Sequence, residues 1–540
     1  MTGRATFAGQ TGGVRMAWRW IALTAAIVIP MAAQAATRVE EVPLWEISAQ
    51  LERGAVSSEA VTGAYLERIA AMDRKGPQLR AIIALNPDAM AQARASDARR
   101  RQGKALGPLD GVPILIKDNI ETQDPVATTA GSLALRDNVG GRDAPVVARL
   151  RAGGAVILAK TNLSEWANIR STHSISGWSA LGGQVRNPYA LDRSPCGSSS
   201  GTGAGVAASF GAGGLGTETD GSVVCPSSLN GLVGLKPTVG LVSRSHIVPI
   251  SHSQDTPGPM ARSVRDVAMM LSAMAGSDPG DPATAEADAH KQDYAAPLAQ
   301  ASLKGVRVAY YRPATGAALA ERFAAALEVL KAQGAELTEV AQPELDGLGQ
   351  AEHEVLRSEL KADLNTYLAG ATAAVKLRTL ADIIAFNRAN AEAEMPLFAQ
   401  ESFEEAEGTR GIADPEYLGA RAKSLRLAAK EGLEVMLAKA DILVQPTTGP
   451  AWLIDPIYND QFRGPSASGL PAVSGYPHLT VPMGLVGGLP VGLSFIARPY
   501  EEGKLLSAGY VYEQTARARV APAYRATVDA GAAFKGAVEK

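Results

Sequence analysis

The chain has 540 residues, a formal net charge of −3 at pH 7, 46% hydrophobic residues and 20% charged residues. A chain of this length and composition buries a substantial core, which excludes an intrinsically disordered protein and a single small domain. The charge is close to neutral, and no run of basic residues with interleaved aromatic residues occurs. These features argue against nucleic-acid binding.

The first 35 residues have the pattern of an export signal. Arg15 and Arg19 precede an apolar run over residues 20–33, and Ala33-Gln34-Ala35 fits a small-residue cleavage site. We therefore expect residues 1–35 to be a signal peptide and the protein to be periplasmic or secreted.

Two alternatives concern this same segment. Translation could start at Met16 instead of Met1, because the residues between them add nothing to the signal. The apolar run is short for a membrane span, but an uncleaved N-terminal anchor is the second alternative. With cleavage we expect no stable membrane association.

The next predicted elements are helices followed by a strand. Apolar residues recur with helical spacing over residues 43–72, and residues 87–101 fit another helix, so we expect a helical N-terminal part over residues 43–105. Residues 111–116 form an apolar run of strand length. This strand ends at Lys117.

The following segments indicate an α/β core. Residues 146–153 fit a helix and residues 155–159 fit a buried strand, and this alternation is typical of α/β proteins. Residues 201–216 are almost all Gly, Ala, Ser, Thr and Val. A flexible linker would be more polar. We therefore expect a helix packed very closely against a sheet.

Residues 281–441 differ in composition and are rich in Ala, Glu, Lys and Leu. Residues 305–311 and 337–341 should bracket a helix as a β-α-β unit, and residues 356–439 are predicted to be mostly helical. We interpret the whole segment as a largely helical insertion. Strands are expected again at residues 442–444 and 479–481.

Lys117 is the first candidate catalytic residue. A lysine between an apolar run and Asp118 could simply extend to water at the end of a strand. The functional alternative is a buried, neutral amine that acts as a base. Lowering a lysine pKa from about 10.4 to 7 costs roughly 4–5 kcal/mol of desolvation, which a fold maintains only for a purpose.

The turn Gly197-Ser198-Ser199-Ser200-Gly201 offers two candidate serines. It matches the G-x-S-x-G pattern of α/β-hydrolases with Ser199 at the centre, but residues 186–193 before it do not form the strand that such an elbow needs. The pattern also needs a histidine. The candidate histidines lie in no supporting motif and each fits an ordinary surface or core residue: His246, His252, His290, His353 and His478.

Ser222 lies in a different environment. It follows Thr219, Asp220 and Gly221 in a bend of small residues between apolar segments, which a plain surface turn explains poorly. Such a bend can direct successive backbone N–H groups at an oxyanion. Ser222 is therefore the candidate nucleophile.

The only two cysteines, Cys196 and Cys225, lie within three residues of Ser198 and Ser222 respectively. Their positions allow a disulfide, but the simpler interpretation is two small buried apolar residues. No CxxC motif or histidine cluster occurs, so no metal site is predicted.

Together these motifs resemble the amidase signature family. Ser198 and Ser222 are separated by 24 residues, which agrees with the family's register and selects Ser198, not Ser199, as the relay serine. The segments that carry the resemblance are residues 109–119, 195–206, 216–262 and 477–495, with Glu501 and Leu505-Leu506.

The resemblance implies an α/β fold with a large mixed central β-sheet, helices on both of its faces, and one amidase-signature domain over residues 36–540. It implies a Lys117–Ser198–Ser222 triad with a cis peptide bond linking Ser198 to its neighbour. Backbone N–H groups of Thr219, Asp220, Gly221 and Ser222 would bind the oxyanion. It implies no metal and no organic cofactor.

Within the family, the motifs around Ser198 and Ser222 look most like those of bacterial peptide amidases, which release ammonia from the C-terminal amide of peptides. Cys196, Thr202, Asp220 and Val224 depart from the general family pattern. Alternatives are an exported amidase or esterase for small aryl or aliphatic amides, a non-catalytic binding protein, and an amidotransferase subunit. We expect a small-molecule or peptide amide as substrate, and a monomer or homodimer.

Overall fold

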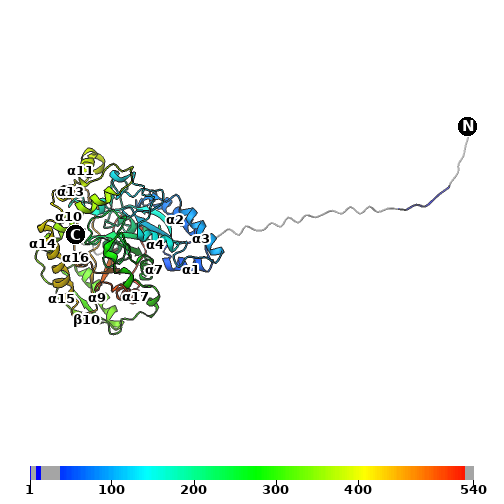
Figure 1. The fold of residues 1–540 in the computed structure, drawn as a ribbon. Helices are drawn as coiled ribbons and strands as arrows, with labels where there is room; N and C mark the ends of the chain where they lie inside the picture. Colours follow the sequence, from blue (N-terminus) through cyan, green and yellow to red (C-terminus); the bar gives the residue numbers. More distant parts are fainter. Residues whose placement is uncertain (2–7, 14–36, 529–540) are drawn as a thin grey trace, which may run out of the picture. The chain divides into compact units, whose positions relative to one another are not determined.

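The computed structural model describes residue 1, residues 8–13 and residues 37–528 (Figure 1). The chain divides into one unit over residues 1–36 and a second over residues 37–540. The described residues of the first unit have no regular secondary structure. The part of the predicted signal peptide (residues 1–35) that carries the export pattern, residues 15–35, lies outside the described residues. No helix in the described ranges combines the length and the apolar character needed to cross a bilayer.

The second unit is built on an 11-stranded sheet. In spatial order its strands are β1 (Ile82–Leu85), β3 (Val156–Thr161), β2 (Pro113–Lys117), β6 (Gly213–Glu218), β8 (Thr256–Ala261), β7 (Val233–Lys236), β12 (His478–Val486), β13 (Leu489–Ile496), β11 (Ile442–Pro446), β9 (Arg307–Tyr310) and β10 (Glu336–Glu339). The sequence predicted β2, β3, β9, β10, β11 and β12, whereas it did not predict β1, β6, β7, β8 and β13. Several strands are buried on both faces.

The sheet is mixed, as the family resemblance implies. Strand β2 runs parallel to both β3 and β6, and β9 runs parallel to both β10 and β11, whereas the other neighbours are antiparallel. Because β2 and β6 are parallel neighbours, their carboxyl ends meet at the same edge of the sheet. Lys117 and Thr217 lie at this edge. A separate two-stranded sheet pairs β4 (Trp178–Ser179) with β5 (Gly183–Gln184).

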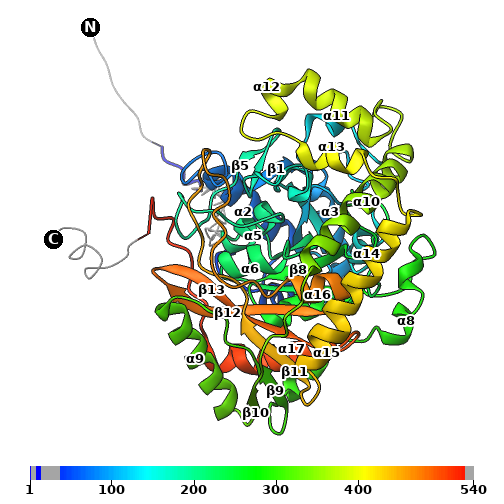
Figure 2. The same ribbon diagram turned by 90° about the vertical axis from the view of Figure 1, so that its left-hand side faces the viewer.

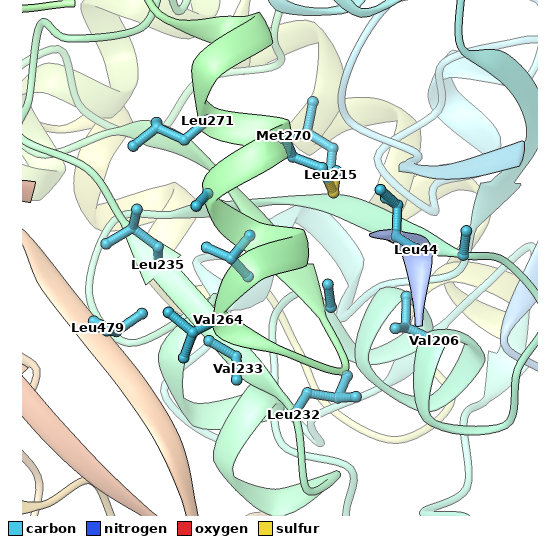
Figure 3. Close-up of a cluster of buried hydrophobic side chains, with 14 of the residues drawn as sticks. Leu44, Val206, Leu215, Leu232, Val233, Leu235, Val264, Met270, Leu271 and Leu479 are labelled. Atoms are coloured by element: carbon cyan, nitrogen blue, oxygen red, sulfur yellow. The ribbon is translucent and has the colours of Figure 1, made fainter. Parts of the chain in front are cut away.

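Helices cover both faces of the sheet, which confirms the predicted architecture. A Cβ placed on Gly213 of β6 would meet Met270 and Leu44, whereas one on the next residue, Gly214, would meet Thr202 and Val206. Successive strand residues point to opposite faces, so the helices of these residues lie on opposite sides of the sheet. Figure 3 shows part of the core between the sheet and the helix that carries Met270.

Three helices begin after a side chain that accepts a hydrogen bond from a backbone amide of the first turn: Ser57, Ser263 and Asp414 are these N-caps. The α-helices are α1 (Leu44–Glu52), α2 (Ser58–Met72), α3 (Ala89–Arg101), α4 (Pro145–Ala152), α5 (Ser200–Ala207), α6 (Val224–Leu229), α7 (Val264–Met274), α8 (Ala287–His290), α9 (Ala317–Ala332), α10 (Leu348–Ala369), α11 (Leu380–Ala389), α12 (Ala391–Glu394), α13 (Glu401–Glu407), α14 (Pro415–Leu425), α15 (Glu434–Met436), α16 (Gly469–Ser474) and α17 (Glu502–Ala516).

Three boundaries differ from the sequence prediction. The segment 201–216 is not one helix, because α5 ends at Ala207 and residues 213–216 belong to β6, a glycine-rich strand of the sheet itself. The N-terminal part over residues 43–105 is not only helical, because it contributes the edge strand β1, which pairs with β3. The predicted β-α-β unit forms as β9, α9 and β10, but these strands extend the central sheet through β11. Residues 281–441 therefore contribute to the core of the second unit. Within that unit, α11 to α13 lie at the opposite end from β9 and β10 (Figure 2).

Glycine in α5 and β6 permits the predicted close approach between helix and sheet. A Cβ on Gly214 would lie 2.6 Å from Thr202 Cγ2 and 3.1 Å from Val206 Cγ2, both in α5. A Cβ on Gly201, within α5, would lie 2.4 Å from the carbonyl oxygens of Ala81 and Asn162. These contacts fix α5, which begins two residues after Ser198.

We expect Gly214→Ala to lower the free energy of unfolding by about 1–3 kcal/mol, because the added methyl group forces α5 away from the sheet. The matched control is Gly419→Ala on α14, where an added Cβ meets nothing within 4 Å. That change should stabilise the helix by roughly 0.5–1 kcal/mol. Chemical denaturation of both variants is the measurement, and equal stabilities would contradict the close packing of α5.

Candidate active site

Lys117 is fully buried at the end of β2. Its Nζ lies 2.7 Å from Ser198 Oγ and 2.8 Å from Thr217 Oγ1. Thr217 Oγ1 also accepts a hydrogen bond from Asn119 Nδ2 at 3.0 Å. The amine is therefore held between the two hydroxyl groups and does not reach water, so the buried interpretation of Lys117 is the one that the geometry supports.

Burial lowers the pKa of Lys117 to about 7. The negative charges of Asp255 and Glu218 act in the opposite direction, but the desolvation of the ammonium form is larger. A large fraction of the amine is consequently neutral at neutral pH. A neutral amine has a lone pair, which can accept the proton of the Ser198 hydroxyl.

Two other lysines are also fully buried, Lys160 and Lys236. Lys160 lies 3.6 Å from the Asp118 carboxylate and 2.8 Å from Thr128 Oγ1. Lys236 is stabilised by the charges of nearby carboxylates, and its pKa is lowered to about 8 by burial. Among the ion pairs of the described residues, none involves Lys117. Burial alone therefore does not distinguish a base, and neither does the lack of an ion pair, which Lys236 shares; contact with a serine hydroxyl does distinguish Lys117.

Ser198 and Ser199 have different surroundings. The Gly197–Ser198 peptide bond is cis, as the resemblance implies. The hydroxyl of Ser199 donates to the Thr217 carbonyl at 3.1 Å and accepts from the Thr217 amide at 3.2 Å, so it is engaged by the backbone of β6. Residues 186–193, before this turn, form no strand. The geometry thus favours Ser198 over Ser199 as the partner of Lys117.

Ser222 lies in the turn between β6 and α6. The backbone of Gly221 has φ +79°, a conformation that glycine adopts without strain. Glu218 is fully buried and accepts hydrogen bonds from the amides of Val223 and Val224, at 2.7 and 2.9 Å. These two bonds fix the turn from inside.

The turn leaves its central amides available. Among the hydrogen bonds found in residues 37–528, none is donated by the amides of Asp220, Gly221 or Ser222. The two serine segments are adjacent, because the Ser199 amide donates to the Ser222 carbonyl at 3.2 Å. No hydrogen bond of the described residues joins the Ser198 and Ser222 hydroxyls. The structure therefore brings Lys117 and Ser198 of the predicted triad into direct contact, but it does not join the Ser222 hydroxyl to either of them.

Cys196 and Cys225 form a disulfide. The interpretation of two unpaired apolar residues is therefore wrong. The bond joins the segment before Ser198 to α6, which follows Ser222, and this connects the two serine segments covalently. Spacing along the chain did not reveal the pair, because the fold brings together residues separated by 29 positions.

A cavity of about 250 Å³ opens beside the two serine segments. Gly197, Gly221 and both cysteines line it, and so do Trp452 and Phe462 from the loop between β11 and α16. A carboxamide in this cavity would lie next to the turn that carries Ser222. This volume is slightly below the range of about 300–1,000 Å³ that is typical of ligand sites.

One group of side chains has the composition of a metal site. Ligand atoms of His252, Glu359 and Asp363 lie within 4.8 Å of one another. The Glu359 carboxylate, however, already accepts hydrogen bonds from Ser253 and Tyr417, at 2.5 and 2.7 Å. This cluster serves to join α10 to the loop before β8, and we assign no metal to it.

Comparison with known proteins identifies the family. The family model named Amidase matches residues 60–506. The chain belongs to the amidase family. It is therefore an enzyme that hydrolyses the C–N bond of amides, and its 11-stranded sheet is that of the amidase signature fold.

Similar proteins cover most of the chain. The structure of a peptide amidase from Stenotrophomonas maltophilia is 49% identical, with a TM-score of 0.84, over 90% of this chain and 99% of that one. A protein of Arabidopsis thaliana named probable amidase is 37% identical over 90% of this chain and 92% of its own length. One subunit of the glutamyl-tRNA(Gln) amidotransferase of Pseudomonas syringae is 36% identical over 88% of this chain and 98% of its own length.

Three residues that shape the site were not predicted from the sequence: Asn119, Thr217 and Glu218. Thr217 and Asn119 orient the amine of Lys117, and Glu218 fixes the turn before Ser222. The available signal for Glu218 is a lone acidic residue at the end of an apolar segment. The role of Thr217 depends on β2 and β6 being neighbours, which the sequence does not reveal.

The low pKa of Lys117 predicts the pH dependence of the enzyme. With Lys117 as the predicted base, we expect the neutral amine to be the active form, so kcat/KM should rise with pH along a limb centred near pH 7 and reach a plateau above it. A pH–rate profile with a neutral amide substrate measures this limb. A limb centred near pH 10 would show that the amine is not desolvated.

The control for this profile is Thr217→Val, which removes the hydroxyl that accepts from Lys117 but keeps the shape of the side chain. Loss of this acceptor leaves the ammonium form with fewer partners in a buried site. We expect the limb to move to lower pH. A limb that is unchanged would mean that another group titrates.

Proposed function

We propose that the enzyme hydrolyses the C-terminal amide of peptide amides and releases ammonia. The observation that carries this proposal is the 2.7 Å contact between Lys117 Nζ and Ser198 Oγ, inside the core and next to the cavity beside Ser222. The 49% identity to the Stenotrophomonas peptide amidase supports the substrate class. A peptide amidase of the same 49% identity has also been crystallised with chymostatin, a competitive inhibitor.

In the first step, neutral Lys117 accepts the proton of Ser198, and Ser198 accepts the proton of Ser222. The Ser222 oxygen then attacks the carboxamide carbon, and the π electrons of the carbonyl move to its oxygen. The amides of Thr219, Asp220, Gly221 and Ser222 hold this oxyanion. Removing one such donor typically costs 10²–10³ in rate, roughly 3–4 kcal/mol.

In the second step the proton returns from Lys117 through Ser198 to the amide nitrogen. The C–N bond breaks, ammonia leaves, and the peptide remains attached to Ser222 as an ester. A water molecule then attacks the carbonyl carbon of this ester, and Ser198 passes the proton of that water to Lys117. When the ester bond breaks, the proton returns from Lys117 through Ser198 to the Ser222 oxygen. The result is a free carboxylate. Glu218 acts only by positioning the turn.

A second candidate function is the hydrolysis of small aryl or aliphatic amides. The small cavity favours this possibility, because about 250 Å³ holds only a few residues of a peptide. The relationship to an amidotransferase subunit suggests a third activity, but the predicted signal peptide and the net charge of −3 do not fit a partner that carries tRNA.

Three serine variants and one lysine variant test the mechanism. Ser222→Ala should abolish ammonia release from a peptide amide, and Lys117→Ala should lower kcat by several orders of magnitude. Ser198→Ala should be much more damaging than Ser199→Ala, which serves as the matched control. A phosphonate should increase the intact mass of the wild type and not that of Ser222→Ala.

A substrate panel separates the candidate functions. A peptide amide, benzamide and acetamide are compared by the ammonia that each releases per unit time. The highest kcat/KM is expected for the peptide amide. A higher kcat/KM for benzamide or acetamide would show that small amides, and not peptide amides, are the substrate class. In the variant experiment, an equal loss of activity in Ser199→Ala and Ser198→Ala would overturn the assignment of Ser198 as the relay serine.

We also propose that the protein is exported, as a periplasmic or secreted monomer or homodimer without stable membrane association. The disulfide between Cys196 and Cys225 supports this location, because such bonds persist in oxidising compartments. The residues of the predicted signal peptide support it independently.

Fractionation of expressing bacteria tests this location. We expect activity in the periplasmic or external fraction and a mature N-terminus near residue 36. The intact mass of this form should be about 2 Da below that of the reduced chain. Control cells express a variant with Arg15 and Arg19 both changed to Glu, which should retain the activity inside. Activity in the cytoplasmic fraction of the wild type would contradict the proposal.

A further inference from the structure

The charged side chains that line the cavity beside Ser222 are all acidic. Two carboxylates line it, those of Asp220 and Asp460, and its remaining lining residues are neutral. Neither a lysine, an arginine nor a histidine is among the described residues that line it. Burial raises the pKa of Asp220, and the hydrogen bond from Ser468 and the charge of Lys236 act in the opposite direction. Lys236 itself does not line the cavity.

Asp460 is fixed as an acceptor. Its Oδ1 accepts from Trp452 Nε1 at 2.9 Å, and the Ser176 amide lies 3.1 Å from both carboxylate oxygens. The Ser176 hydroxyl donates to Oδ2 at 2.5 Å. All of these partners donate, an arrangement that suits an ionised carboxylate. Burial acts against these bonds and raises the pKa of Asp460.

No cation neutralises this carboxylate, because no ion pair in the described part of the chain includes Asp460. Its bond to Trp452 also orients an aromatic wall. The rings of Trp452 and Phe462 meet edge to face with centroids 5.3 Å apart, and both line the cavity. A fixed negative charge beside aromatic rings favours a cationic group over an anionic one.

This inference rests on the proposed function. We propose that Asp460 determines the charge selectivity of the enzyme. It favours peptide amides that carry a basic residue at the scissile amide and disfavours those that carry an acidic residue. Asp220 adds to the same field, but its backbone belongs to the oxyanion turn, so Asp460 is the specificity residue that can be changed alone.

The same charge distinguishes product from substrate. Hydrolysis converts a neutral carboxamide into a carboxylate inside a cavity that already holds negative charge. The product acid is therefore repelled, whereas the substrate is not. Weak product inhibition follows from the same residue that selects the substrate.

The test uses three N-acetylglycyl amides that differ only in the last residue, which is Lys, Gln or Glu. For the wild type, kcat/KM should fall in the order Lys, Gln, Glu, with steps of roughly fivefold each. Added salt should reduce these ratios, because it screens the charges. These measurements need no variant, so they hold even if a variant does not fold.

Asp460→Asn removes the charge and can keep the geometry. Its amide oxygen can still accept from Trp452 and Ser176, and its NH₂ can donate to the Ser176 hydroxyl. The Lys-to-Glu ratio should fall by about tenfold, and the acid N-acetylglycylglutamine should inhibit roughly fivefold more strongly. The control is Asp455→Asn on the same loop, which lies outside the cavity and should leave both values unchanged.

The outcomes separate this inference from the proposed function. No ammonia from any of the three amides, with activity on benzamide, would overturn the proposed function. Hydrolysis of all three amides with equal kcat/KM would overturn the charge selectivity alone. A Lys-to-Glu ratio that persists unchanged in folded Asp460→Asn would show that another residue sets it, which also overturns the proposal.

Discussion

The site depends on keeping the Lys117 amine away from water. Burial lowers its pKa from about 10.5 to about 7, which corresponds to roughly 4–5 kcal/mol of lost interaction for the ammonium form. The unfolded chain binds this proton up to its ordinary pKa. The penalty to folding is therefore largest below pH 7 and decreases as the pH rises from 7 towards 10.5. The hydrophobic core around β2 offsets this cost, which favours a base at the end of a buried strand over one in a surface loop.

The parts of the site come from neighbouring strands and from the turns that follow them. Lys117 is at the end of β2, Thr217 is at the end of β6, and Glu218 fixes the turn to Ser222. Strand residues have well-defined directions, so the hydroxyl and the amine meet without long flexible loops. The turn before α6 supplies what the strands do not, namely amides that donate no hydrogen bond among the described residues. The disulfide then holds the two serine segments together where no hydrogen bond of the described residues joins their hydroxyls.

Much of this arrangement was predictable from the sequence, for physical reasons. Apolar runs of strand length identified β2, β3 and β11, and the small residues before Gly216 indicated the close packing of α5. The position of Lys117 after an apolar run, and the bend before Ser222, identified the candidate residues. Contacts between distant segments were not predictable. The order of strands in the sheet, the edge strand β1, the pairing of Cys196 with Cys225 and the place of Asp460 all depend on which elements become neighbours.

The position of β12 has a consequence for how the chain can be made. This strand lies between β7 and β13, although β7 ends about 240 residues earlier in the sequence. A ribosome delivers β12 only after most of the chain has emerged, so until then the two parts of the sheet have no strand to unite them. Because the chain is synthesised from its N-terminus, the core can be completed only in the final stage of synthesis. Truncation before β12 would leave the sheet in two incomplete parts, each with an unpaired edge strand.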